Sequence, residues 1–378
     1  MKAMSKCFSV VLAAASLLTL AGCKKATPNN RVATTANWNT RTATIVEKNY
    51  LDFWQTHKEK AVYSLSFKES GNPKYSVNYD TAHAVYSTEF YMESAYDWSS
   101  DKLPEEYRKE EKLTEPVYVY ETSLTISGAY KVKSSGEEFA FSDVLKSVCK
   151  FRLAGENLKP VYSHQIIQNT APASLGSDNI KDNYVQINQV VETFYNKEFT
   201  QSTAYITDKK TENAETVTKK TGLNNGSGYS VFDNSQINAA VRAFTFTGGA
   251  TRFFNTVIPQ DNTLATCKVT IGSPVELNRE DEVQRQIVLA LENCTPNDYI
   301  FFDGAATGEE KNKTIRYNAV ALSVVADLTG PTPVSWYSTV ENNDVNGTRC
   351  VLLRRDTPAA FGLGTLTYAL KSLNVETI

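Results

Sequence analysis

The segment PVYVYETSLTISGAYKVK, residues 116–133, decides the fold because apolar and polar residues alternate along much of it. In an extended strand, Val117 and Val119 share one face, while Tyr118 and Tyr120 share the other. Both faces are therefore apolar at this end, which favours burial on two sides over a sheet with one wet face. The segment forms either one long strand or two paired strands.

Similar alternating runs lie on both sides of this segment, and each predicts a strand. They include residues 61–67, 74–80, 84–94, 144–153, 160–168, 183–195, 263–271, 286–293, 315–328, 334–340, 348–355 and 363–373, with a hairpin over 199–220. Strands do not alternate with helices, which disfavours a parallel nucleotide-binding sheet. We expect a mainly β fold: an antiparallel sandwich or half-barrel with one or two short helices.

Two segments have helical periodicity. The first, residues 49–60, places four larger side chains on one face, namely Tyr50, Phe53, Trp54 and His57. The second, residues 234–246, has apolar residues at i, i+3, i+4 and i+7, namely Ile237, Ala240, Val241 and Phe244. Asp233 or Asn234 can cap this helix, and the glycine pair 248–249 can end it. The charged segment 101–116 predicts an exposed loop or short helix.

The N-terminus has the parts of a secretory signal. Lys2 and Lys6 give a positive start, and an apolar run over 8–20 precedes the small residues Ala21 and Gly22. This run is too short for the roughly 20 residues that a membrane-spanning helix needs. The next residue is Cys23.

Leu20-Ala21-Gly22-Cys23 resembles the lipobox of bacterial lipoproteins. The resemblance implies cleavage before Cys23, diacylglycerol on its thiol, and acylation of the new amine with a fatty acid such as palmitate. It therefore implies an extracytoplasmic protein of a bacterial cell envelope, held at a membrane by lipid. Two or more acyl chains anchor a protein stably without a spanning helix. The alternative is an ordinary signal peptide with an incidental cysteine.

These observations divide the chain into three parts. We expect a lipoprotein signal peptide over 1–22, a lipidated tether over 23–40, and a β-rich extracytoplasmic domain over 41–378. The loop NNGSG, residues 224–228, suggests an internal boundary near 222–230.

The charge of the chain does not suggest a nucleic-acid surface. Its 39 basic and 42 acidic residues give a net charge of −3, and removal of Lys2 and Lys6 with the signal makes the mature charge more negative. Lysine pairs such as 209–210 and 219–220 are interspersed with glutamates, as in solvated hairpins.

Four cysteines remain after the signal and the lipidated residue are set aside: Cys149, Cys267, Cys294 and Cys350. Outside the cytosol, four thiols can form two disulfides in three connectivities. Four buried free thiols are the alternative, because cysteine packs as a small hydrophobe.

The sequence carries no recognisable catalytic or cofactor motif. Three histidines, His57, His83 and His164, lack metal-ligand spacing, and there is no HExxH, GxSxG or GxGxxG motif. We therefore expect no catalytic residue, no metal and no cofactor. A pair of carboxylates placed for glycoside hydrolysis stays open, because such a pair is defined by separation in space.

The 20 tyrosines offer two interpretations. In the first, the strands enclose a thick core with tyrosines on its outer face. In the second, Tyr118, Tyr120 and Phe244 line a pocket for an apolar ligand that is closed by the helix at 234–246. A half-barrel with a helical lid resembles, at the level of the fold, lipid carriers of bacterial envelopes.

We therefore expect a lipid-anchored envelope protein with a non-enzymatic β-rich binding domain for an apolar ligand or a glycan. Two alternatives remain: a structural or assembly partner of another envelope protein, and a carboxylate-based hydrolase.

Overall fold

A computed structural model describes most of the chain beyond residue 56. The described residues are 57–154, 157–172, 184–210, 214–224, 229–242, 251–293, 318–326, 333–338, 351–359 and 362–377.

Strands dominate these residues. In the first half they are β1 (His57–Glu69), β2 (Tyr75–Tyr79), β3 (Val85–Asp97), β4 (Thr114–Val132), β5 (Glu138–Ala154), β6 (Asn157–Pro172), β7 (Tyr184–Tyr195), β8 (Gln201–Asp208) and β9 (Thr216–Gly222). In the second half they are β10 (Val231–Asp233), β11 (Thr251–Ile258), β12 (Thr263–Ile271), β13 (Val275–Glu276), β14 (Asn318–Ala326), β15 (Val334–Ser338), β16 (Leu352–Pro358) and β17 (Gly364–Thr377). The described helices are α3 (Ile237–Val241), α4 (Glu282–Glu292) and the 3-10 turns η2 (Glu105–Tyr107), η3 (Asn234–Gln236) and η4 (Pro259–Asp261).

The 17 described strands form one sheet. Its hydrogen-bonded order is β10-β11-β12-β14-β15-β16-β17-β1-β3-β4-β5-β6-β7-β8-β9, with β13 beside β14 and β2 beside β4. Every described pairing is antiparallel except that of β10 with β11. Strands on both sides of 222–230 belong to this sheet. The prediction of a mainly antiparallel β fold with one or two short α-helices is confirmed.

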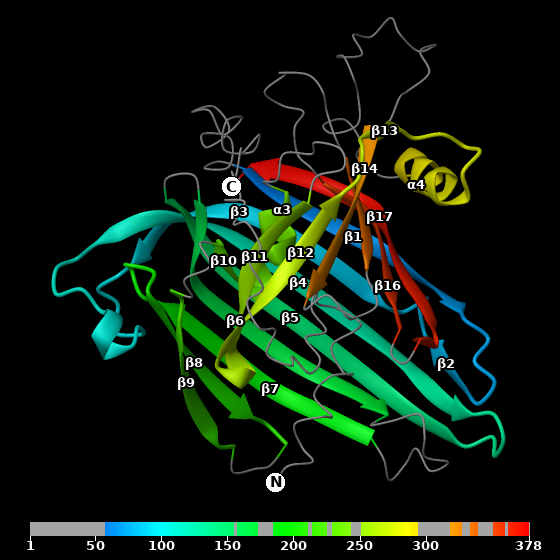
Figure 1. The fold of residues 1–378 in the computed structure, drawn as a ribbon, viewed down its shortest axis with the longest axis horizontal. Coiled ribbons are helices and arrows are strands. Elements are labelled where there is room, and N and C mark those ends of the chain that lie inside the picture. The colour runs from blue at the N-terminus through cyan, green and yellow to red at the C-terminus, as the bar shows by residue number, and fades with distance from the viewer. Residues whose placement is uncertain are drawn as a thin grey trace, which may run out of the picture.

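The sheet curls so that one end covers the inner face of its middle (Figure 1). The long strands β4 to β7 form a tilted wall, and β10, β11, β12 and α3 lie over this wall. Contacts of β10 with β6, of η3 with β5 and β6, and of η4 with β8 and β9 hold the two layers together. The apolar core lies between the layers, because both surfaces turn their buried side chains toward it.

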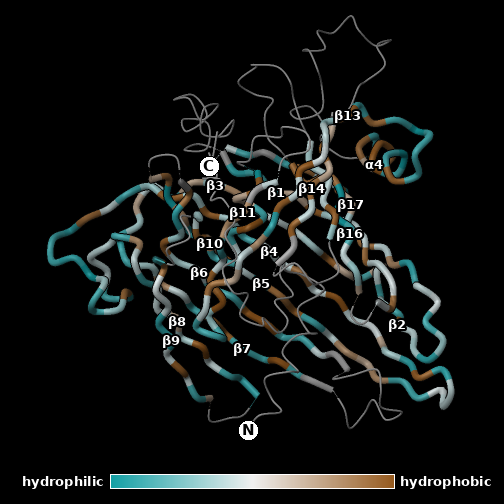
Figure 2. The backbone as a smooth tube through the Cα atoms, in the orientation of Figure 1, coloured by the Kyte–Doolittle hydropathy of each residue, from teal (hydrophilic) through white to brown (hydrophobic). Residues whose placement is uncertain are grey.

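Segment 116–133 lies within the 19-residue strand β4, which confirms the single-strand alternative. Its even-numbered residues face the core, and apolar and polar residues alternate along the long strands in Figure 2. Tyr118 and Tyr120 are 7% and 4% exposed, and lie on this inner face beside Phe151 and Cys149 of β5. The interpretation that places these tyrosines on the outer face is therefore wrong. Val117 is buried on the opposite face, as two-sided burial requires.

The segment from β10 to α3 is held inside by a buried carboxylate. Asp233 Oδ2 accepts hydrogen bonds of 2.6 Å from both Ser163 Oγ and Tyr195 OH. Its Oδ1 accepts from the backbone N–H of Ser235 at 2.8 Å and from the Ser235 hydroxyl at 2.5 Å. These four donors replace the water that a buried carboxylate loses, and the Ser235 N–H bond also caps η3. The capping role predicted for Asp233 is confirmed.

Two further acids are buried on the inner face. Glu59 forms a bidentate pair with Arg242, at 2.8 Å to Nη1 and 3.0 Å to Nη2. Asp143 accepts from Thr170 N at 2.9 Å and from Asn169 Nδ2 at 2.8 Å. Burial raises the pKa of Asp143 to about 7, although the Thr170 N–H bond opposes the rise.

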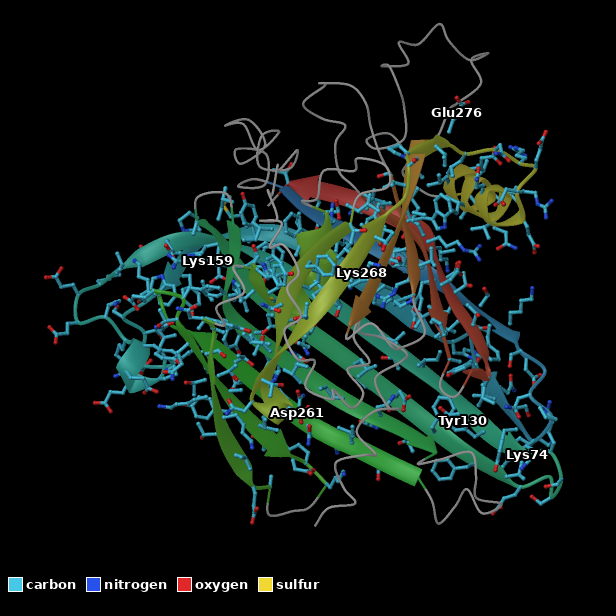
Figure 3. The ribbon with its side chains drawn as sticks, in the orientation of Figure 1. Lys74, Tyr130, Lys159, Asp261, Lys268 and Glu276 are labelled. Atoms are coloured by element: carbon cyan, nitrogen blue, oxygen red, sulfur yellow. The ribbon has the colours of Figure 1, made fainter. Side chains whose placement is uncertain are left out.

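Gly128 marks a close approach between β4 and its neighbours. An added Cβ would lie 2.3 Å from the carbonyl oxygen of Asn78 on β2 and 2.7 Å from the ring of Phe141 on β5. Tyr130, two residues further along β4, lies with Lys74 at the lower right of Figure 3, whereas Glu276 lies at the top of the view. No residue with a side chain fits at position 128 without a shift of backbone.

The helical predictions are only partly correct. Residues 57–60 belong to β1, so the helix predicted over 49–60 is wrong there, and 49–56 lie outside the described residues. The helix predicted over 234–246 starts as η3 and continues as α3 to Val241. The strand predicted over 286–293 is wrong, because α4 covers most of this stretch. Asp281 caps α4 through Gln284 N at 2.9 Å, and its buried apolar residues are Ile287, Val288 and Leu291.

Candidate ligand-binding groove

A groove of about 820 Å³ lies on the outer face of the sheet. Its floor consists of outward-facing residues of β3, β5, β6, β7 and β8, and its wall is the loop after β3. The lining residues are Glu93, Ala95, Tyr96, Asp97, Ser100, Asp101, Lys102, Leu103, Pro104, Glu105, Lys150, Tyr162, Glu192, Phe194 and Tyr205. A volume in this range suits a small ligand.

The floor of the groove is aromatic. The rings of Tyr162 and Phe194 lie 5.1 Å apart, and those of Phe194 and Tyr205 lie 6.0 Å apart at 75°. These three residues come from neighbouring strands, because an antiparallel sheet places alternate residues of each strand on one face. Phe194 is buried, while Tyr162 and Tyr205 are half-buried. Two tyrosine rings are therefore available to a ligand.

Two carboxylates lie beside this aromatic floor, one in a hydrogen bond and the other in an ion pair. Glu192 Oε1 accepts a hydrogen bond of 2.9 Å from Tyr162 OH. Burial, and then the charge of Glu192, raise the pKa of Tyr162, so its hydroxyl stays a donor at physiological pH. Glu93 Oε2 lies 2.5 Å from Lys150 Nζ. The spare lone pairs of both carboxylates can accept from a ligand.

The loop that walls the groove is fixed by Trp98, whose side chain is fully buried. Its indole Nε1–H donates to Glu115 Oε1 at 2.7 Å, and its ring packs against Tyr96 with centroids 5.1 Å apart. Backbone hydrogen bonds join Trp98 to Leu113 and Lys109, which closes the loop on itself. Trp98, Leu103 and Tyr107 of this region form one small apolar cluster with Val117, Val161 and Phe194 of the sheet, so the wall is packed against the sheet.

Contacts with the β8–β9 hairpin hold the other side of this loop. Tyr107 OH lies 2.8 Å from Thr203 Oγ1, and Glu106 pairs with Lys220 at 2.7 Å. The predicted short helix or exposed loop is therefore a mainly exposed loop with one 3-10 turn, η2, whose Tyr107 is buried. These contacts hold the groove open without a ligand, which reduces the entropy lost on binding.

The groove is acidic. Five of its lining residues are acidic and two are lysines. At the rim, Asp97 accepts from the hydroxyl and the backbone N–H of Ser99, at 2.6 Å and 2.9 Å. These bonds, the hydroxyl first, lower the pKa of Asp97. Asp101 and Glu105 are exposed on the same loop. The groove therefore attracts neutral hydrogen-bond donors or cations and repels anions.

The ligand-lining residues that the sequence suggested lie elsewhere. Tyr118 and Tyr120 belong to an inner cluster with Phe151 of β5 and Ala239 of α3. Phe244 lies outside the described residues. Neither Tyr118 nor Tyr120 lines the outer groove, which is on the other face of the sheet.

The cysteines in the described part of the chain are Cys149 and Cys267, and both are buried. Neither forms a disulfide, so the pairing of these two with each other is excluded. Burial raises the pKa of Cys149, which makes its thiol unreactive. Cys23, Cys294 and Cys350 lie outside the described residues.

Within the described part of the chain, no three His, Cys, Asp or Glu side chains lie together as a metal site requires. His83 Nδ1 lies 2.8 Å from Asp80 in an exposed turn, and His164 is on β6. None of the described helices combines the length and hydropathy needed to cross a membrane.

Comparisons with known proteins give little. No protein-family model and no curated protein matches the sequence. A β-barrel-like protein of domain of unknown function DUF1849 from Brucella abortus is 7% identical, covering 85% of this chain and 97% of that chain, with a TM-score of 0.34. A proposed lipoprotein from Parabacteroides distasonis is 8% identical over 85% and 98%, with a TM-score of 0.17.

An exported protein with a YmcC-like fold from Bacteroides fragilis is 7% identical over 85% of this chain and 95% of that chain, with a TM-score of 0.17. At TM-scores below 0.5, these likenesses carry no argument about this protein, whose function has to be inferred from its own residues.

Proposed function

We propose that this protein is a lipid-anchored cell-envelope protein whose β domain binds a glycan in the outer groove without transforming it. The observation that carries the proposal is the aromatic floor of Tyr162, Phe194 and Tyr205 beside the Glu192 carboxylate. A sugar ring presents hydroxyl donors at its edge and apolar C–H groups on its faces. Carboxylates accept hydrogen bonds from the sugar hydroxyls, and aromatic rings pack against the C–H faces of the sugar.

A glycan suits this groove better than an apolar ligand does. Pockets for apolar ligands are lined mainly by hydrophobic side chains with few polar groups. Here seven of the lining residues are charged. A purely apolar ligand would remove water from these charges without replacing its hydrogen bonds, which is unfavourable.

The anchor rests on the sequence alone. Cleavage before Cys23 and acylation of that residue would leave residues 23–40 as a tether between the lipid and the domain. With two or three acyl chains, the domain would stay at an extracytoplasmic membrane surface. A glycan of the cell envelope or of the surroundings would then reach the groove by diffusion.

The assembly-partner alternative has weaker support. Strand β9 is one edge of the sheet, and an exposed edge can pair with another protein. However, β9 carries Lys219 and Lys220, and edge lysines oppose strand addition.

The test is a glycan-binding measurement on a matched pair of variants. Glu192→Gln removes the charge of the groove carboxylate and keeps its size. Glu121→Gln makes the same change at a Tyr–Glu pair outside the groove, where Tyr91 OH lies 2.7 Å from Glu121 Oε1. Against a panel of neutral and amino-sugar oligosaccharides, we expect Glu192→Gln to weaken binding about 10- to 100-fold, because hydrogen bonds to charged groups are worth about 1.5–3 kcal/mol.

Glu121→Gln should bind like the wild type, and Tyr205→Ala should lose about 3- to 10-fold with its ring contact. Equal binding by both glutamine variants, or no binding of any oligosaccharide, would refute the proposal. The bound glycan should be recovered intact after long incubation; its shortening would favour the hydrolase alternative instead.

A further inference from the structure

The inner face of the sheet holds an arginine that differs from its neighbours. Arg242 pairs with Glu59, and Arg354 Nε lies 3.0 Å from Asp356 Oδ2. Arg355, the residue next to Arg354, points to the other face and is 3% exposed. Among the described residues, no carboxylate forms an ion pair with Arg355, and its Nε–H has no hydrogen-bond acceptor.

The surroundings of Arg355 are hydroxyl groups rather than acids. Its cross-strand neighbours are Ser335 on β15 and Tyr368 on β17. Two positions further along β16, Thr357 also faces inward, and its hydroxyl is buried without a partner in the described part of the chain. The hydroxyl of Tyr368 is likewise buried without a hydrogen-bond partner in the described part of the chain. The Tyr86 ring packs edge-on against Tyr368, with centroids 5.1 Å apart.

The tyrosine hydroxyls lie close enough to Arg355 to sense its charge. Burial raises the pKa of both Tyr86 and Tyr368, and the guanidinium opposes the rise in each case. The same holds for Tyr337 on β15. Tyr86, Tyr337 and Tyr368 therefore all sense the charge of Arg355, and Tyr337 also senses that of Arg242. Phenol and threonine hydroxyls can both donate hydrogen bonds.

An arginine guanidinium keeps its positive charge in proteins, even when it is buried. An uncompensated charge in a protein interior is strongly destabilising. Because no carboxylate in the described part of the chain forms an ion pair with Arg355, an anion from outside the protein is the way that we consider for compensating its charge. Donors that face one another around a cation are the arrangement that binds an oxyanion.

We infer that Arg355, with the hydroxyls of Tyr368 and Thr357, binds the carboxylate of a small amphiphile on the inner face of the sheet. One uncompensated positive charge matches one negative charge, which favours a carboxylate over a doubly charged phosphate. The inner residues Leu366 and Leu370, which flank Tyr368 on β17, are buried, so the part of the ligand beyond its carboxylate would meet apolar side chains. This site is separate from the outer groove and does not depend on the glycan proposal.

The experiment uses the full chain and its variants, purified in detergent, and hexanoate as a water-soluble probe. Thermal unfolding and the carboxyl ¹³C shift of [1-¹³C]hexanoate are followed at constant ionic strength. At a hexanoate concentration 100 times Kd, the unfolding equilibrium constant should fall about 100-fold. Arg355→Met should abolish this response and should be more stable than the wild type without hexanoate, because it removes an uncompensated charge.

Arg354→Met is the matched control, because it removes the adjacent arginine from the opposite face and should keep the hexanoate response. Arg355→Lys keeps the positive charge but cannot form bidentate hydrogen bonds, so it should bind hexanoate more weakly. The inference is overturned if the wild type does not respond, or if Arg355→Met responds equally. Protection by inorganic phosphate but not by hexanoate would overturn the carboxylate assignment.

Discussion

Asp143 should make the stability of this protein depend on pH. Its carboxyl is 3% exposed, and burial raises its pKa from 3.8 to about 7. The folded state therefore holds this proton more tightly than the unfolded chain does. This contribution to stability is fully present below pH 3.8 and is lost as the pH rises through 7.

The magnitude follows from the two pKa values. At about 1.36 kcal/mol per unit, the full effect is about 4 kcal/mol, of which about 2–3 kcal/mol falls between pH 5 and pH 8. Asp143→Asn replaces the carboxyl by a neutral amide of the same shape. Its oxygen can still accept from Thr170 N. The Asn169 Oδ1 has no partner in the described part of the chain, so a rotated Asn169 amide can accept from the new NH₂ group.

The assay is urea unfolding of the wild type and Asp143→Asn from pH 5 to pH 8. The stability of the variant relative to the wild type should rise by about 2–3 kcal/mol over this range. Asp261→Asn, at an exposed carboxylate on η4, should show no such trend. A difference between Asp143→Asn and the wild type that stays constant with pH would show that Asp143 does not titrate between these limits.

Three other outcomes are expected. Glu59→Gln should lower the free energy of unfolding by about 3–5 kcal/mol, because it removes the buried carboxylate of the bidentate ion pair with Arg242. Glu69→Gln, at the exposed pair with Lys133, should cost under about 1 kcal/mol by the same urea assay. Gly128→Ala should cost about 1–3 kcal/mol or more through the backbone clash at its Cβ, and an unchanged melting temperature would contradict this. Cys23→Ser should abolish incorporation of labelled palmitate in cells and release the protein from the membrane fraction; continued labelling would exclude the lipobox assignment.

Much of the sheet could be predicted from the sequence because strand periodicity is local. The alternation in 116–133 predicted burial on two sides and either one long strand or two paired strands, and the structure has the single strand β4. Helix α4 was missed because its apolar run is short, and a run such as QIVLALEN fits a buried strand as well as a helix. Asp281, just before the helix, caps it by accepting a hydrogen bond from Gln284 N.

The groove could not be predicted, because its parts meet only in three dimensions. Glu192 and Phe194 alternate on β7 like any outward-facing pair, and Tyr162 is one of many strand tyrosines. Their role depends on the loop after β3 packing on the outer face of the sheet. The β3–β4 pairing also has a register irregularity between Glu93 and Tyr96, just before this loop, which the sequence does not indicate. The parallel pairing of β10 with β11 is equally non-local.

The pairing of β1 with β17 bears on export. These strands are hydrogen-bonded along their length, yet Ser64 and Ala369, which are partners, are 305 residues apart in the chain. β1 also pairs with β3, but over only five residues. If the protein is exported as proposed, most of one edge of β1 stays unpaired until β17 has left the secretion channel. An unpaired edge favours misassembly, so a chaperone that shields nascent strands should raise the yield of this protein.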